Sequence, residues 1–436
     1  MKINDARLLG PLEPRWAIMT NTQQGAPEDA MPDEHVSVQG QRAALAVMAV
    51  VLVLSMTTWF STSAIIPQLR SQWSLGTNEA SLLIIAVQLG FVAGALISAT
   101  LNLTDVFPAP RILWLSSFGA ALANAGIVFA HGPAAALPLR FLTGVCLAGV
   151  YPTSLKIMST WFERGRGTAL GIMIGALTIG SAAPHLVNGA GGLGWREVIV
   201  ATSALTAAGG ALALIAVRDG PFPFPRARFD PRQVGNVFAN RGVRLASIGY
   251  FGHMWELYAM WAWFLAFMTD ELARRGHPSH QAAALATFAV IGVGGIGCWI
   301  GGILGDNWGR TRTTAAAMAI SGTCGVLAGV VYGGPVALVL VVGLVWGLTV
   351  VADSAQFSTI VTELADRSYV GTALTLQLAV GFTLTVVTIW LVPVLRDLLG
   401  WRWTFAFLSP GPAVGIVAML RLLRLPEHEL IAGGRG

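Results

Sequence analysis

Three ionisable residues in the second half of the chain carry side chains that could take up and release a proton. His253 and Glu256 stand three positions apart, and Asp353 lies further along, each inside a long apolar stretch. A charged group in a lipid bilayer is costly unless it is paired or hydrated, so such residues are functional candidates by default. Residues three apart share one face of a helix. We therefore expect a proton-coupling site of Glu256, His253 and Asp353. The alternatives are a structural hydrogen bond from Glu256 to a neighbouring helix and pairing of Asp353 with the adjacent loop.

Six further residues could bind a substrate beside these groups. They bring positive charge, a hydroxyl, an amide and aromatic rings into apolar stretches, and they are Arg140, Lys156, Trp59, Thr58, Tyr250 and Gln356. The mixture of basic and acidic side chains favours a small organic anion or a zwitterion. Two alternatives stay open, namely that Lys156 extends to the membrane surface and that Trp59 marks the membrane interface.

The chain lacks the residue patterns of an enzyme. His253-x-x-Glu256 has no second histidine at the spacing of a zinc site, and no phosphate-binding loop of the Walker type occurs. Cys146, Cys298 and Cys324 fit neither a disulfide framework nor a metal site. We expect no catalytic residues, no metal and no cofactor, and an ion gradient rather than ATP as the energy source.

The elements that must hold these side chains are membrane-spanning helices. Of the 436 residues, 54% are hydrophobic and only 11% are charged, against about 25% charged in a soluble domain. Apolar windows of about 20 residues recur, which is the length of helix that crosses a hydrocarbon core of about 30 Å. We expect an all-α membrane protein with twelve transmembrane helices. The expected spans are residues 43–66, 78–101, 111–130, 134–160, 168–188, 197–217, 242–268, 281–304, 313–332, 336–360, 372–395 and 404–423.

Two short sequences occur twice and divide these spans into halves. Gly-Thr-Ala-Leu at 167–170 returns at 371–374, and Gly-Trp-Arg at 194–196 returns at 400–402. This internal repeat predicts two pseudo-symmetric halves of six helices. The expected organisation is a disordered cytoplasmic tail at 1–42, a first half at 43–217, a cytoplasmic linker at 218–241, a second half at 242–424 and a cytoplasmic tail at 425–436. Met1 and Met19 are both candidate start residues.

A glycine-rich loop between the eighth and ninth spans carries a further pattern. It reads Gly-Ile-Leu-Gly-Asp-Asn-Trp-Gly-Arg-Thr-Arg at 302–312, and a partial copy at 104–111 keeps Asp105 and Arg111. At these residues the chain resembles the major facilitator superfamily of transporters, whose signature is Gly-x-x-x-Asp-x-x-Gly-Arg. The resemblance implies that the first, fourth, seventh and tenth spans line a central cavity. It also implies a conformational gate that stabilises the outward-open state, formed by Asp306, Gly309, Arg310 and Arg312, with Asp105 and Arg111 in part.

Together these features predict a secondary transporter that moves a small solute by alternating access and is coupled to protons. We expect a monomeric, multi-pass protein of the bacterial inner membrane with both termini cytoplasmic, because the basic residues cluster on that side. The net charge of +5 then reflects this topology and contact with anionic lipid, not a nucleic-acid partner. The alternatives are a proton-antiport exporter of drugs or metabolites and, from another class, a transporter-like membrane sensor of solutes.

Overall fold

Helices form all the regular structure in the described part of the chain, which confirms the expected all-α fold. The structure is a computed structural model, and it describes residues 38–162, 165–191, 193–222, 229–366 and 368–436. Most of the expected N-terminal tail, with both candidate start methionines, lies outside the described residues, and so do residues 223–228 of the expected linker.

Eleven continuous or interrupted helices of the described residues are long and apolar enough to cross a membrane, and each overlaps one expected span. They are Val38–Trp73, Thr77–Thr100, Ala109–Phe129, Pro133–Ser159, Arg166–Gly189, Trp195–Ala216, His280–Asn307, Arg310–Val331, Val336–Leu364, Val370–Leu399 and Trp401–Leu422. The twelfth expected span is the 34-residue helix α11 (Arg241–Arg274). It is not among the eleven because His253, Glu256 and several Trp and Tyr side chains make it less apolar.

Four spans are interrupted along their length, and two of these breaks hold candidate residues. The interrupted spans are α1 (Val38–Ser55), η1 (Met56–Thr58) and α2 (Ser61–Trp73); α6 (Pro133–Leu147) and α7 (Tyr151–Ser159); α12 (His280–Gly292) and α13 (Gly294–Asn307); and α15 (Val336–Val350) and α16 (Ser354–Leu364). Trp59 lies in the first break and Asp353 in the last. A break frees backbone carbonyls inside a span, where they can accept hydrogen bonds from side chains.

The remaining spans are continuous or nearly so. They are α3 (Thr77–Thr100), α5 (Ala109–Gly126) with η2 (Ile127–Phe129), α8 (Arg166–Gly189), α9 (Trp195–Ala216), α14 (Arg310–Val331), α17 (Val370–Leu399), and α18 (Trp401–Thr404) with η4 (Phe405–Leu408) and α19 (Pro410–Leu422). Short elements join them: α4 (Leu103–Val106), η3 (Pro231–Gln233), α10 (Val234–Ala239) and η5 (Pro426–Leu430).

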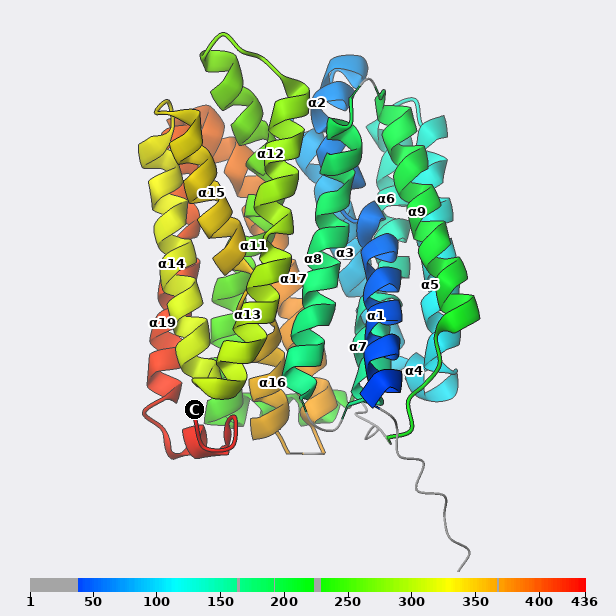
Figure 1. Ribbon diagram of the computed structural model, residues 1–436, viewed down its shortest axis with the longest axis vertical. Coiled ribbons are helices and arrows are strands. Elements are labelled where there is room, and N and C mark those ends of the chain that lie inside the picture. The colour runs from blue at the N-terminus through cyan, green and yellow to red at the C-terminus, as the bar shows by residue number, and fades with distance from the viewer. Residues whose placement is uncertain (1–37, 163–164, 192, 223–228, 367) are drawn as a thin grey trace, which may run out of the picture. The chain divides into compact units, whose positions relative to one another are not determined.

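The spans pack mainly within the first six and within the last six. α3 packs on α6, α5 on α9, and α1 on α8 and α9, while α11 packs on α17 and α19 and α14 on α15 and α19. The two groups meet where α8 contacts α12 and α13 and where α3 contacts α17 (Figure 1). Small residues permit these close approaches. A Cβ on Gly90 would lie 2.0 Å from the carbonyl oxygen of Phe141, and one on Gly175 would lie 2.8 Å from that of Gly295.

Two sharp glycine turns mark the two ends of the helices. Gly309, with φ of +106°, precedes α14 at what we call the signature end, which is the lower end in Figure 1. Gly400, with φ of +68°, precedes α18 at what we call the Gly-Trp-Arg end, which is the upper one. A positive φ is open to glycine and strained for most other residues, so these turns explain Gly309 and Gly400, whereas Gly194 of the first Gly-Trp-Arg copy has a φ of −74°.

Candidate functional site

Arg140 is enclosed by neutral hydrogen-bond acceptors in the first half. Its side chain is 1% exposed, and it leaves α6 toward the break in the first span. Its guanidinium donates to the carbonyl oxygens of Leu83 (3.3 Å), Thr58 (3.0 Å) and Trp59 (2.6 Å), to Ser61 Oγ (3.2 Å) and to Asn124 Oδ1 (3.3 Å). It has no carboxylate partner among the described residues. Arg140 therefore holds the break at Thr58 and Trp59 in place and leaves its positive charge without a counter-ion.

An aromatic cluster fills the space between the break in the first span and the second half. The ring centre of Trp59 lies 4.8 Å from that of Phe91, 5.7 Å from that of Phe382 and 5.9 Å from that of Tyr258. Tyr258 in turn lies 5.1 Å from Phe382. Because α11 and α17 supply Tyr258 and Phe382, this cluster joins the two groups of helices at the candidate residue Trp59.

Three tyrosine hydroxyls face the same region from both groups of helices. Tyr151 begins α7, and Tyr250 and Tyr258 lie on α11, close enough for the three phenols to interact electrostatically. The Tyr250 ring also lies against Gly381 of α17, where an added Cβ would come within 2.3 Å of it. None of the three hydroxyls donates a hydrogen bond to another described residue, so they are free to bind a polar ligand.

His253 is paired with Asp353 and not with Glu256. His253 Nδ1 lies 2.8 Å from Asp353 Oδ1, and the two side chains are 1% and 2% exposed. Neither His253 Nε2 nor Asp353 Oδ1 accepts or donates an aligned hydrogen bond among the described residues, so the two side chains are in ion-pair contact only. The contact links α11 to the break between α15 and α16, so the pair is formed by residues far apart in sequence.

Glu256 points to two other helices. Its Oε2 accepts a hydrogen bond of 2.8 Å from Ser321 Oγ on α14, and its Oε1 accepts one of 2.8 Å from Trp346 Nε1 on α15. The residue is 1% exposed. Both partners are neutral, and no cation lies in salt-bridge contact with the carboxylate in the described part of the chain. Asp353 and Cys324 are near enough to interact with it electrostatically. The hydrogen bond to a neighbouring helix that the sequence left open as an alternative is therefore present.

Gln356 belongs to the loop network at the signature end. Its Oε1 accepts from Arg310 Nη1 (2.9 Å), and its Nε2 donates to the carbonyl oxygen of Gly301 (3.2 Å). Arg310 also contacts Asp306 Oδ1 (3.2 Å) and Glu363 Oε1 (3.1 Å). Arg310 is 6% exposed, so it is the buried centre of this network.

Asp306 also connects the signature loop to the first half. Thr168 Oγ1 donates to Asp306 Oδ2 over 3.3 Å, and a Cβ on Gly167 would lie 2.6 Å from Asp306 Oδ1. Both contacts are in the first turn of α8, where the helix dipole favours a negative charge. The first copy of the repeated Gly-Thr-Ala-Leu therefore contacts the aspartate of the signature.

The remaining predicted gate residues, Asp105, Arg111 and Arg312, do not take part in the network around Arg310. Asp105 Oδ1 accepts from Lys156 Nζ at 2.7 Å, and Lys156 also donates to the carbonyl oxygen of Thr104 at 2.7 Å. Arg111 is exposed, and it forms no ion pair with Asp105. Arg312 is exposed, and its Nη1 reaches only the carbonyl oxygen of Trp308 at 3.5 Å. Lys156 is thus placed at the signature end and not beside the aromatic cluster.

A segment near the C-terminus covers the signature loop. Arg435 Nη1 donates to the carbonyl oxygen of Asp306 at 2.5 Å, and Thr311 N donates to that of Gly436 at 3.2 Å. Ala432 N donates to Glu363 Oε2 at 3.2 Å. Ile431 anchors the segment with no exposed surface. We call residues 431–436 the C-terminal clasp, because they bind the Glu363 side chain and the backbone of Asp306 and Thr311, beside the network around Arg310.

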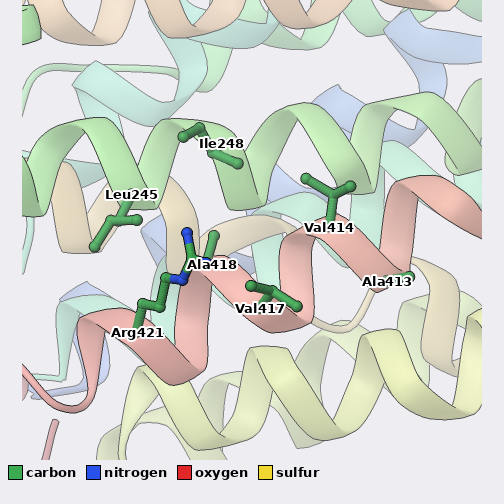
Figure 2. Close-up of a pocket in the computed structure, with 7 residues that line it drawn as sticks. All are labelled: Leu245, Ile248, Ala413, Val414, Val417, Ala418 and Arg421. Carbon is green, nitrogen blue, oxygen red and sulfur yellow. The ribbon is translucent and has the colours of Figure 1, made fainter.

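Two cavities of the described residues lie away from these side chains. One is an apolar groove on the outer side of α11 and α19, with Arg421 beside Ala418 and Val417 (Figure 2). The other lies at the Gly-Trp-Arg end and is lined by Asp270, Arg274, Tyr332, Arg396, Gly400, Trp401 and Arg402. Neither contains a residue that the sequence singled out for coupling or binding.

Several partners in the site escaped the sequence reasoning. Ser321, Trp346 and Glu363 each bind a predicted residue from another helix, and Tyr151 and Tyr258 join Tyr250. Ser and Trp give no signal of their own in an apolar span. Tyr250 and Tyr258 are eight residues apart, about two turns along a similar side of α11, and this is the one pattern that could have indicated the tyrosine group.

Comparison with known proteins gives three findings. The family profile described as Major Facilitator Superfamily matches residues 48–270. A relative from Cupriavidus necator, named as the probable sulfoacetate transporter SauU, is 22% identical over 306 residues, which cover 65% of this chain and 70% of the relative. Among solved structures, a bacterial homolog of the human lysosomal transporter Spinster, in an inward-facing and unoccupied conformation, has a TM-score of 0.62. It is 15% identical, covers 88% of this chain and 95% of its own, and bears on the fold alone.

Proposed function

The chain belongs to the major facilitator superfamily, and from this premise we propose that it is a proton-coupled secondary transporter of a small organic anion. Membership of the family makes it a multi-pass membrane protein that transports a solute and is not an enzyme. The proton coupling, the anionic substrate and the alternating access of the two halves are the proposal. So are the inner-membrane location, the cytoplasmic termini and the division of the chain at residues 218–241.

The observation that carries the proposal is the presence of two buried carboxylates, Glu256 and Asp353, and of one buried histidine that contacts Asp353. Glu256 and Asp353 are each 1% exposed, and His253 lies 2.8 Å from Asp353. A bilayer strongly penalises a charge that has no counter-ion. One histidine can neutralise one of two acids, and the donors to Glu256 are neutral. The least costly state therefore has a proton bound in this group, and a change of partners would release it.

The anionic substrate is supported by Arg140 and by the free tyrosine hydroxyls. Arg140 supplies a buried positive charge that no carboxylate offsets in the described residues. Tyr151, Tyr250 and Tyr258 can donate hydrogen bonds to oxygens of a ligand, and Trp59 can cover its apolar part. The relative from Cupriavidus necator is named for sulfoacetate, a small anion with a carboxylate and a sulfonate, which belongs to the chemical class that these residues would bind.

Alternating access is supported by the position of the polar contacts. At the signature end, Asp306 contacts α8 across the two groups of helices. At the Gly-Trp-Arg end, Thr77 Oγ1 donates to Asp397 Oδ2 over 3.3 Å, and Asn188 lies 2.8 Å from the Nε2 atom of His280. Each contact must break for its end to open. The Arg310 network and the C-terminal clasp brace the signature end, and we assign that end to the cytoplasm.

The test is transport by the purified full-length protein in proteoliposomes. Uptake of radiolabelled sulfoacetate, and of acetate and taurine as comparison probes, would be measured with and without an inside-alkaline pH gradient. We expect the gradient to accelerate uptake of at least the sulfoacetate probe, and a protonophore to abolish that acceleration. Counterflow without a gradient would separate transport from coupling.

The outcomes separate the parts of the proposal. Uptake that does not respond to the gradient would contradict proton coupling, and preference for taurine over both anions would contradict the anionic substrate class. Substrate that binds without crossing the membrane would contradict transport.

A further inference from the structure

A basic cavity lies at the Gly-Trp-Arg end, within the second half. It is formed by the ends of α11, α14 and α17 and by α18, and it measures about 430 Å³. That volume is within the usual range for a small-ligand site, about 300–1,000 Å³. Its lining comprises three arginines, one acid and two aromatic rings, namely Arg274, Arg396, Arg402, Asp270, Tyr332 and Trp401, together with Gly400.

The positive charge of this cavity is not matched by acids. Arg274 and Arg402 are exposed and form no ion pair in the described part of the chain. Arg396 pairs with its neighbour Asp397, whose side chain is 48% exposed. The hydroxyl of Tyr332 donates to Asp270, and burial together with that carboxylate raises the pKa of Tyr332, so the hydroxyl stays a donor. Asp270 keeps its negative charge in this hydrogen bond and offsets one of the three arginines, so a positive excess remains in the lining.

A fourth arginine adds to this imbalance from the first half. Arg70, near the end of α2, is close enough to Arg396 for the two like charges to interact, and Asp397 is also close enough to interact with it. Arg70 donates to Thr77 Oγ1 over 3.2 Å and has no carboxylate in direct contact among the described residues. Asp397, which pairs with Arg396, offsets only part of the repulsion between the two arginines, so a further anion beside them would be favourable.

Aromatic rings fix the guanidinium groups and leave their edges available. Arg274 Cζ lies 5.1 Å from the Tyr332 ring centre, and Arg396 Cζ lies 6.0 Å from that of Trp401. Phe267 packs against both rings, and its ring centre lies 5.4 Å from that of Tyr332 and 5.6 Å from that of Trp401. A guanidinium stacked on a ring can still bind a planar or tetrahedral oxyanion through its N–H edge.

The internal repeat provides a comparison within the same chain. Gly400-Trp401-Arg402 matches Gly194-Trp195-Arg196, but four residues earlier the second half has Arg396 where the first half has Ala190. Arg196 folds over Trp195, with Cζ 4.7 Å from the ring centre, and donates to the carbonyl oxygen of Val128. Arg402 therefore follows the repeat as the counterpart of Arg196, whereas Arg396 is a departure of the second half from it.

We propose that Arg274, Arg396 and Arg402 form a binding site for an oxyanion, closed on its sides by Tyr332 and Trp401. The shared chemistry is a phosphate, sulfonate or carboxylate group, whether on a free solute or on the headgroup of an anionic lipid. Trp and Tyr are common at the depth of lipid headgroups, so both sources are chemically compatible with the site. The site is separate from the proposed coupling group and does not depend on a transport cycle.

The experiment uses full-length protein, purified in lipid-free detergent, and two probes. Thermal unfolding would be followed in sodium phosphate and in sodium chloride of equal ionic strength. Retention of phosphatidylglycerol over phosphatidylcholine would be measured by native mass spectrometry. The test variant is Arg274→Gln with Arg402→Gln, and the matched control is Arg196→Gln. We expect the test variant to bind its anion about tenfold or more weakly, because it loses the charge-assisted hydrogen bonds of two guanidinium groups, and the control to bind as the unmodified protein does.

The two arms identify the source of the anion. A phosphate-dependent rise in melting temperature that the test variant loses supports a site for a free oxyanion. Selective loss of phosphatidylglycerol from the test variant, without a phosphate effect, supports a headgroup site. Equal behaviour of the test variant and the unmodified protein in both arms overturns the proposal, as does an equal loss in Arg196→Gln.

Discussion

His253 Nδ1 lies 2.8 Å from Asp353 Oδ1, and both side chains are almost completely buried. This contact joins α11 to the break between α15 and α16. Replacement Asp353→Asn keeps the shape of the side chain and removes its charge, so His253 loses its counter-ion. Breaking a buried pair destabilises the fold by about 3–5 kcal/mol. Because an amide cannot take up and release a proton, we also expect gradient-driven uptake to fall about tenfold or more. The fall in uptake would be measured as the initial rate of gradient-driven uptake by the Asp353→Asn variant in proteoliposomes.

The exposed Glu429 provides the control for this change, because Glu429→Gln also removes one negative charge. The double variant His253→Gln with Asp353→Asn should be no worse than Asp353→Asn alone, since two residues that act as one unit are not additive. If both single variants keep full gradient-driven uptake, the pair has a structural role and no part in coupling.

Glu256 permits coupling and stability to be separated with two replacements. Glu256→Gln can still accept a hydrogen bond from Trp346 Nε1 and can reverse the one to Ser321 Oγ, but it cannot titrate. We expect it to exchange substrate at close to the normal rate while no longer responding to a pH gradient. Glu256→Ala leaves the buried Trp346 Nε1 without a partner, at about 1–3 kcal/mol, while Ser321 Oγ can still donate to the carbonyl oxygen of Met318 (3.3 Å), so its melting temperature should fall. A gradient response retained by Glu256→Gln would show that the proton is carried elsewhere.

Arg140 should tolerate no replacement by another cation. Its planar guanidinium donates to acceptors from three segments, including the carbonyl oxygens of Thr58 and Trp59. Lysine has a single ammonium that cannot reach these positions at once. We expect Arg140→Lys to lower the melting temperature and to reduce substrate affinity several-fold, because the break that carries Trp59 loses its support. Unchanged melting and affinity in Arg140→Lys would contradict this account, and Arg424→Lys, an exposed site, is the control.

The helices of this protein could be predicted from sequence because the bilayer fixes their length and forces internal hydrogen bonding. The expected span at residues 242–268 is a helix for the same reason, although its charges and rings lower its hydropathy. The breaks at Trp59 and Asp353 could not be foreseen in this way. The mean hydropathy of a window of apolar residues is the same whether the helix is continuous or interrupted. The one proline nearby, Pro67, lies inside α2 and does not mark the break that precedes this helix.

The choice of partners was the part of the site that sequence could not provide. Three-residue spacing correctly puts His253 and Glu256 on neighbouring positions of one helix, but neighbours on other helices decide which groups they bind. Asp353, at the break between α15 and α16, contacts His253, whereas Ser321 on α14 donates to Glu256. Lys156 likewise pairs with Asp105 because the short loop after α3 comes back to α7, and no local pattern encodes that return.

Two arginines of the signature make a matched pair for testing the gate. Arg310 is buried and contacts Asp306, Gln356 and Glu363, whereas Arg312 is exposed and forms no ion pair with a described residue. We expect Arg310→Gln to open the signature end more often and Arg312→Gln to have little effect. The native Cys298, which is 2% exposed and faces Thr178 on α8, reports this opening. In protein with Cys146 and Cys324 replaced by alanine, its alkylation by N-ethylmaleimide should be several-fold faster in Arg310→Gln. Equal rates in the two variants would argue against a gate at Arg310.

The C-terminal clasp should reinforce the same closed end. Arg435 binds the carbonyl oxygen of Asp306, and Ala432 N binds Glu363. Deletion of residues 432–436 removes both contacts and the bond between Thr311 and Gly436, but it leaves the ion pairs of Arg310 intact. We therefore expect Cys298 alkylation to accelerate in the deletion variant, by less than in Arg310→Gln. Adding the deletion to Arg310→Gln should give little further change, because the clasp acts on a network that Arg310 already holds together. Full additivity would mean that the clasp stabilises the protein independently of the gate.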